Sequence, residues 1–243
     1  MTSRLRTTFF FILFFLTASV VHAQNAGTTH VFPQIVDGVW SDGSAFTSRF
    51  LIASIGGFPA ACNISLFGIG PERLTASASV LVQPASWETI STRGQGVIAA
   101  GYARLDCSQP VFASLTYSLQ SANGTPLGIA TVPGAPVASN ALIPMVLNGR
   151  YRYGIAMANN NDALLAVSLS FTSNGTTVLR TLQVPARSHY VAFVDELFSV
   201  PAEGSGTFEI FANGSVGSGN FNITALLFDH AAFTNVVAAV VYS

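Results

Sequence analysis

The chain has 243 residues, of which 50% are hydrophobic and only 9% are charged, and its formal net charge is −1. All of the basic residues are arginines and the charges are scattered singly, so we expect no basic surface for nucleic acid or anionic lipid. Such a length suits one large β domain or two of about 100 residues each.

The first 23 residues have the pattern of a secretory signal peptide. Arg4 and Arg6 precede an apolar run over residues 9–21, which is shorter than the roughly 20 residues needed to span a bilayer. The small residue Ala23 before Gln24 predicts cleavage between these two. We therefore expect a secreted, extracellular protein without a transmembrane span in the mature chain; an uncleaved anchor is the alternative.

Two Asp-Gly steps follow in the segment FPQIVDGVWSDGSAF, residues 32–46. Asp37 and Asp42, with Ser44, supply too few oxygen ligands for a calcium site, and their spacing fits no EF-type loop. Asp before Gly is typical of tight turns. We predict that both aspartates turn the chain; a metal site is the alternative.

Two cysteines, Cys62 and Cys107, remain after the leader. An even number of cysteines in an exported protein favours a disulfide, which would close a loop of about 46 residues. Alternation places Cys62 on the same strand face as Ile64, and Cys107 on the same face as Leu105. We predict a Cys62–Cys107 disulfide in the interior; two buried free thiols are the alternative.

Most of the chain alternates apolar and polar residues, as half-buried strands do. The clearest examples are residues 111–120 (VFASLTYSLQ) and 164–171 (LLAVSLSF), separated from their neighbours by Gly, Pro and Asn-Gly turns. The one segment that resembles a helix is VDELF, residues 194–198. Many short strands at regular spacing predict an all-β sandwich or barrel.

The strand pattern of the first half returns about 104 residues later. Residues 47–54 (TSRFLIAS) align with residues 151–158 (YRYGIAMA), and NISLF, ending at Phe67, aligns with SLSF, ending at Phe171. Between the copies, residues 132–140 (VPGAPVASN) predict an extended, unpaired linker. We therefore predict two tandem antiparallel β-sandwich domains, immunoglobulin- or fibronectin-like, each with its own closed core. The predicted ranges are 1–23 for the signal peptide, 24–138 for domain 1 and 139–243 for domain 2.

The segments FPQIVDG, PAACNISLFG and VPGAPV resemble a repeat of exported bacterial proteins, notably acidobacterial ones. In that repeat an FPxxADG-like opening precedes a TNP-type turn and successive strands, often in tandem. Here IASIGGFPA stands in place of the Asn-Pro turn, and the second copy has ALIPMVLNG in place of the opening. The resemblance covers nearly all of the mature chain. It implies a β-sandwich module of uncharacterised role and brings no catalytic residues.

Catalytic patterns are weak. There is no GxSxG segment, and we interpret His189, with Ser188 and Asp195 nearby, as a histidine at a strand end. Asp195, Glu196, Glu203 and Glu209 are interpreted as solvated carboxylates rather than a glycosidase pair. We predict no enzymatic activity, no cofactor and no metal.

Aromatic rings offer the remaining candidate site. Trp40, Trp87, Tyr151 and Tyr153 would form a ligand platform if they were exposed together, although buried rings are commoner. The sequence thus predicts a secreted or cell-surface, non-catalytic β-sandwich with a structural, adhesive or recognition role toward a surface, matrix or glycan partner. The alternatives are a carbohydrate-binding module, an outer-membrane β-barrel and a hydrolase.

Overall fold

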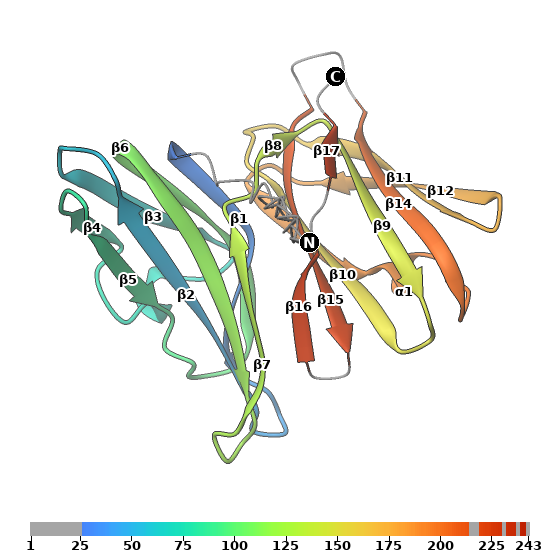
Figure 1. Ribbon diagram of the computed structural model, residues 1–243, viewed down its shortest axis with the longest axis horizontal. Coiled ribbons are helices and arrows are strands. Elements are labelled where there is room, and N and C mark those ends of the chain that lie inside the picture. The colour runs from blue at the N-terminus through green and yellow to red at the C-terminus, as the bar shows by residue number, and fades with distance from the viewer. Residues whose placement is uncertain (1–25, 214–218, 230–231, 237–238, 242–243) are drawn as a thin grey trace, which may run out of the picture.

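The computed structural model describes residues 26–213, 219–229, 232–236 and 239–241, so the predicted signal peptide lies outside the described residues. Within these ranges all regular structure is β-strand apart from two short helices. The α-helix, α1 (Val194–Leu197), lies in the predicted VDELF segment. No helix of the described ranges has the length and hydropathy needed to cross a bilayer. Figure 1 shows two lobes side by side, the first coloured blue to green and the second yellow to red.

The first lobe is one seven-stranded antiparallel sheet that curls strongly on itself (Figure 1). Its strands are β1 (Gly27–Val39), β2 (Ala45–Ser54), β3 (Ala60–Phe67), β4 (Ser79–Val82), β5 (Trp87–Ser91), β6 (Ala99–Gln120) and β7 (Pro126–Pro133), with the 3-10 helix η1 (Pro71–Arg73) after β3. The 22-residue strand β6 holds the sheet together. Its first half pairs with β1 and β3, and its second half pairs with β2 and β7.

The second lobe consists of two five-stranded antiparallel sheets. One contains β8 (Val137–Ala138), β10 (Tyr151–Asn159), β13 (Ser188–Phe193), β15 (Phe221–Asp229) and β16 (Ala232–Val236). The other contains β9 (Asn140–Leu147), β11 (Leu165–Ser173), β12 (Thr176–Val184), β14 (Gly204–Ala212) and β17 (Ala239–Val241).

The pairings of the second lobe follow those of the first. The order β4-β3-β6-β1 in the first lobe corresponds to β12-β11-β14-β9 in the second, and the order β5-β2-β6-β7 corresponds to β13-β10-β15-β16. The two halves of the continuous β6 thus take the places of the separate strands β14 and β15. This order differs from that of a constant-type immunoglobulin domain, in which the first strand lies beside the second in one sheet. In the second lobe β9 pairs with β14 instead, and β10 pairs with β15 in the other sheet.

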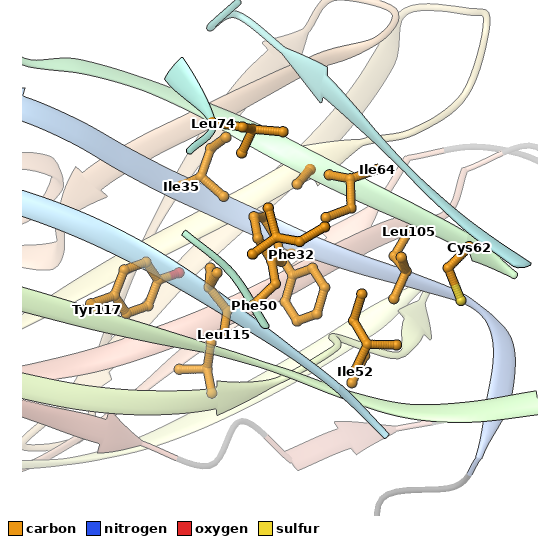
Figure 2. Packing of buried hydrophobic residues seen from close by; sticks show 14 of the residues in the cluster. Phe32, Ile35, Phe50, Ile52, Cys62, Ile64, Leu74, Leu105, Leu115 and Tyr117 are labelled. Atoms are coloured by element: carbon orange, nitrogen blue, oxygen red, sulfur yellow. The ribbon is translucent and has the colours of Figure 1, made fainter. Parts of the chain in front are cut away.

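Alternation along the strands builds the core, as the sequence predicts. In β11, Leu165, Val167, Leu169 and Phe171 are buried, whereas Ala166 and Ser168 are partly exposed. The first lobe is filled in the same way. Figure 2 shows Phe32 of β1 and Phe50 of β2 meeting at its centre, where the two rings make an edge contact with centroids 5.4 Å apart.

The first core is not closed by the first lobe alone, which corrects the prediction of two independently closed cores. Leu226 of β15 and Phe233 of β16 are 7% and 6% exposed and belong to the first hydrophobic cluster. Phe233 stacks on Phe46 of β2 with ring centroids 5.8 Å apart. The hairpin β15–β16 of the second lobe therefore covers apolar side chains of the first.

The segment between the lobes is also paired, contrary to the predicted unpaired linker. The backbone N–H of Ala135 donates to the carbonyl of Val31 at 2.7 Å. The side-chain amide of Asn222 donates to the Ala135 carbonyl at 2.9 Å, and β8 pairs with β15. Residues at the boundary thus bond to both lobes, because their backbone groups are partly buried and need partners.

Candidate functional site: an apolar cleft between the lobes

The four aromatic residues singled out in the sequence do not form one exposed strip. Tyr153 is buried in the second core, and its hydroxyl accepts a hydrogen bond from the Val146 N–H at 2.8 Å. Tyr151 is partly buried against the same core. Trp40 and Trp87 are exposed, at 48% and 63%.

The two tryptophans also lie far apart. Trp40 follows Val39, which pairs with Ala45 at the start of β2, whereas Trp87 pairs with Ala53 near the end of the same strand. Eight residues of extended strand correspond to about 26 Å. The tryptophans therefore belong to two different surfaces.

The two aspartates of the opening segment have different roles. Asp42 makes the predicted turn, since its Oδ1 accepts hydrogen bonds from the N–H and the hydroxyl of Ser44 at 2.9 and 2.6 Å. These bonds, the hydroxyl first, lower the pKa of Asp42. Asp37 instead lies within β1, fully buried, and binds Arg73 and the N–H of Gly94. The prediction that Asp37 serves a turn is wrong, because its carboxylate bridges distant segments.

Cys62 and Cys107 form the predicted disulfide. They are directly opposite each other on β3 and β6, with Cα atoms 4.0 Å apart. The bond thus joins neighbouring strands of one sheet and closes a loop over a sequence separation of 45 residues. A disulfide is typical of an oxidising compartment.

The residues considered for catalysis in the sequence each contact different partners. Asp195 accepts a hydrogen bond from Nε of Arg152 at 2.8 Å, and Glu209 accepts one from the hydroxyl of Ser170 at 3.4 Å. His189 lies on β13 opposite Ala158, and burial lowers its pKa. Within the described ranges, no group of three or more His, Cys, Asp and Glu side chains is placed to hold a metal ion.

A mostly apolar cleft lies between the lobes; we call it the interlobe cleft. Its volume is about 410 Å³, within the range of small-molecule sites. The first lobe contributes residues from β1, the start of β2 and the start of β6, and the second contributes residues from β10, β13, α1 and β15. The lining side chains used below are Trp40, Phe46, Ala100, Phe193, Leu226 and Phe228.

A row of four aromatic rings runs beside the cleft from one lobe to the other, and three of them, Phe46, Phe228 and Phe193, line it. Phe46 stacks on Phe233, Phe233 meets Phe228 at 5.5 Å, and Phe228 meets Phe193 edge-on at 5.1 Å. Gly154 makes the last contact possible, because a Cβ atom at this position would lie 2.9 Å from the Phe228 ring. Phe46, Phe228 and Phe193 thus give the cleft an aromatic wall.

Polar groups gather at one end of this wall. The guanidinium carbon of Arg152 lies 3.7 Å from the centroid of the Phe193 ring. Asp195 and Glu196 both accept hydrogen bonds from Arg152, and the Asp195 bond is the main reason that its pKa is raised. Glu196 and Gln34 also line the cleft. An apolar interior with a few polar groups at its edge can hold an amphipathic molecule in one orientation.

The sequence points to Trp40 but not to the cleft around it. Phe46 is more than 140 residues away in sequence from Phe193 and Phe228, and each of the three resembles an ordinary core residue of a strand. The available signal was the isolated glycine Gly154 between Tyr153 and Ile155 on β10, because a glycine inside a strand often marks the close approach of another group.

Neither a family model nor a curated protein matches the chain. Among solved structures, the chain has a faint similarity to the apo form of a Pleurotus ostreatus lectin, at 12% sequence identity over 90% of this chain and 77% of that chain. The TM-score of this comparison is 0.19. At that value the similarity carries no argument about the fold or the ligand.

Proposed function

We propose that this chain is an exported, non-catalytic recognition protein of two tandem β-sandwich units that binds a small apolar or amphipathic molecule in the interlobe cleft. The observation that carries the proposal is the cleft itself, with its aromatic wall and its few polar groups. Sites of this kind commonly lie at the junction of two structural units.

The placement of the cleft supports a binding role. Phe46 belongs to the first lobe, and Phe193 and Phe228 belong to the second, so both lobes contribute to one ligand site. Trp40 stands at its edge with about half of its surface exposed. A molecule that enters the cleft removes apolar surface of both lobes from water. Each Å² of apolar surface buried in this way contributes about 25 cal/mol of favourable free energy.

Export and the absence of catalysis are further parts of the proposal. The leader pattern of the first 23 residues and the disulfide support an extracellular role, where recognition of a surface, matrix or small molecule is the expected function. The carboxylates near the cleft, Asp195 and Glu196, are engaged by Arg152. Their ion pairs support a positioning role rather than acid–base chemistry.

The test uses the fact that the chain has two tryptophans. In a Trp87→Phe variant of the mature chain, Trp40 becomes the sole tryptophan and reports on the cleft. Titration with the neutral fluorescent probe N-phenyl-1-naphthylamine should give saturable binding with one site and energy transfer from Trp40. The measurement is repeated after adding Ala100→Phe, which places a ring in the cleft.

Ala100→Phe should weaken probe binding at least about tenfold, because the new ring occupies the ligand volume. The matched control is Thr176→Phe, which adds the same ring at an exposed position of β12. Near-ultraviolet circular dichroism verifies that the variants keep their packing. Probe binding that does not saturate, or that survives Ala100→Phe unchanged, would overturn the proposed site.

A further inference from the structure

The outer face of the first lobe around Trp87 is a second surface with its own chemistry. It is formed by β5, β2, the second half of β6 and β7. Inward residues such as Phe50, Ile90 and Leu115 are buried. Residues one position away therefore point outward, and Trp87 is one of them.

The Trp87 ring is unusually accessible. β5 is an edge strand of the sheet, and the cross-strand neighbour of Trp87 is the small residue Ala53. With 63% of its surface exposed, the ring presents apolar area without a side chain large enough to cover it. An exposed indole on a sheet can stack on the C–H face of a sugar ring while its N–H donates a hydrogen bond.

Hydroxyl groups continue the face beyond the ring. The exposed Thr89 and the partly exposed Ser114 lie on either side of Leu51, one pairing step from Trp87. The next row contains Thr116 and Thr131, whose hydroxyl oxygens are 2.8 Å apart. These groups can each donate and accept hydrogen bonds, as the hydroxyls of a sugar also do.

The face is almost free of charge. At the outward positions of these four strands, Arg49 is the one charged side chain, and its Nε donates to the hydroxyl of Ser91 at 3.2 Å. A surface with a single charge and no cluster of either sign favours an uncharged ligand over a polyanion or a polycation.

We propose that this face binds a neutral polysaccharide, with Trp87 as the stacking platform and the neighbouring hydroxyls as hydrogen-bonding groups. An exposed aromatic ring beside hydroxyl groups, with Arg49 as the one charge among them, matches the two faces of a pyranose, one apolar and one rich in hydroxyls. The site is separate from the interlobe cleft, since Trp40 and Trp87 lie at opposite ends of β2. The experiment below therefore tests this polysaccharide site separately from the proposed binding of a small molecule in the interlobe cleft.

The experiment is native affinity electrophoresis of the mature chain. The gels contain a neutral polysaccharide (hydroxyethylcellulose, mixed-linkage β-glucan, galactomannan or dextran) or, as an acidic counterpart, polygalacturonate. At least one neutral polysaccharide should retard the protein. Trp87→Ala should weaken that retardation about tenfold or more, the contribution expected from an aromatic stacking contact, and Trp87→Tyr should retain part of it.

Trp40→Ala is the matched control, because it removes the other tryptophan and should leave the retardation unchanged. In a Trp40→Phe variant, Trp87 is the sole tryptophan, and an oligosaccharide of the retarding polysaccharide should change its emission. A second arm tests flotation with phosphatidylcholine vesicles, because Ile55 and Phe58 are exposed in the loop after β2, at 66% and 72%. The proposal would be overturned if no neutral polysaccharide retarded the protein, or if polygalacturonate alone did. It would also be overturned if both tryptophan variants lost retardation equally, or if the protein bound only to vesicles.

Discussion

Arg73 and Asp37 form an ion pair that joins two distant parts of the first lobe. The Asp37 side chain is fully buried, and its Oδ2 lies 3.1 Å from Nη1 of Arg73. Its other oxygen accepts the N–H of Gly94 at 2.6 Å. Arg73 also donates to the carbonyls of Gln95 and Val97. One carboxylate and one guanidinium thus hold the loop between β5 and β6 against β1.

Replacing Asp37 with alanine should destabilise the fold strongly. The change leaves the N–H of Gly94 without its acceptor and removes the partner of a partly buried cation, which together cost about 3 kcal/mol of unfolding free energy. Urea unfolding followed by tryptophan fluorescence measures the loss. Asp42→Ala is the control and should have a much smaller effect, because Asp42 is an exposed turn residue. Equal losses would contradict the distinction between the two aspartates.

Removing the disulfide should also lower the stability. The chain-entropy relation for a loop of this size gives about 4 kcal/mol of unfolding free energy. We expect a Cys62→Ala/Cys107→Ala double variant to lose stability up to this amount in urea unfolding. Dithiothreitol should shift the unfolding of the parent chain toward that of the variant and leave the variant unchanged. A reductant effect on the variant, or none on the parent, would show that the bond is not what stabilises this sheet.

The contribution of the second lobe to the first core predicts coupled unfolding. Phe233→Ala should lower the unfolding free energy by about 3 kcal/mol, because it opens a cavity among Phe46, Leu226 and their neighbours. Both tryptophans lie in the first lobe, so their fluorescence reports that lobe's transition. Phe58→Ala is the control: because Phe58 is exposed, this change should alter the unfolding free energy by less than about 0.5 kcal/mol. An unchanged tryptophan transition in Phe233→Ala would mean that the lobes unfold independently.

Local features of this fold could be predicted from the sequence because they depend on neighbouring residues. The alternation of β11 and the turn at Asp42 follow from period and turn chemistry. The alternation of side chains along the strands also indicated that Cys62 and Cys107 point inward, and the even number of cysteines suggested a disulfide between them.

Features that depend on distant segments could not be predicted in this way. Asp37 resembles a turn residue until Arg73, 36 positions later, is placed beside it. The strand β6 resembles two strands, since nothing in its pattern indicates that it continues from one pair of partners to the next. The cleft requires Phe46 and Phe228, from different lobes, to line the same space, and only the tertiary arrangement decides that. Such residues retain the same alternation whether they face a core or a cleft.

His189 should make the stability depend on pH in the weakly acidic range. Burial lowers its pKa below the ordinary value of 6.5, so the unfolded chain binds a proton more readily than the folded one, and stability falls as the pH drops below about 6.5. We expect the unfolding free energy to decrease between pH 7.5 and 5.5. In a His189→Gln variant this decrease should be smaller, whereas His30→Gln should retain the dependence that His189 causes. An equal pH dependence in the parent and His189→Gln proteins would show that another group is responsible.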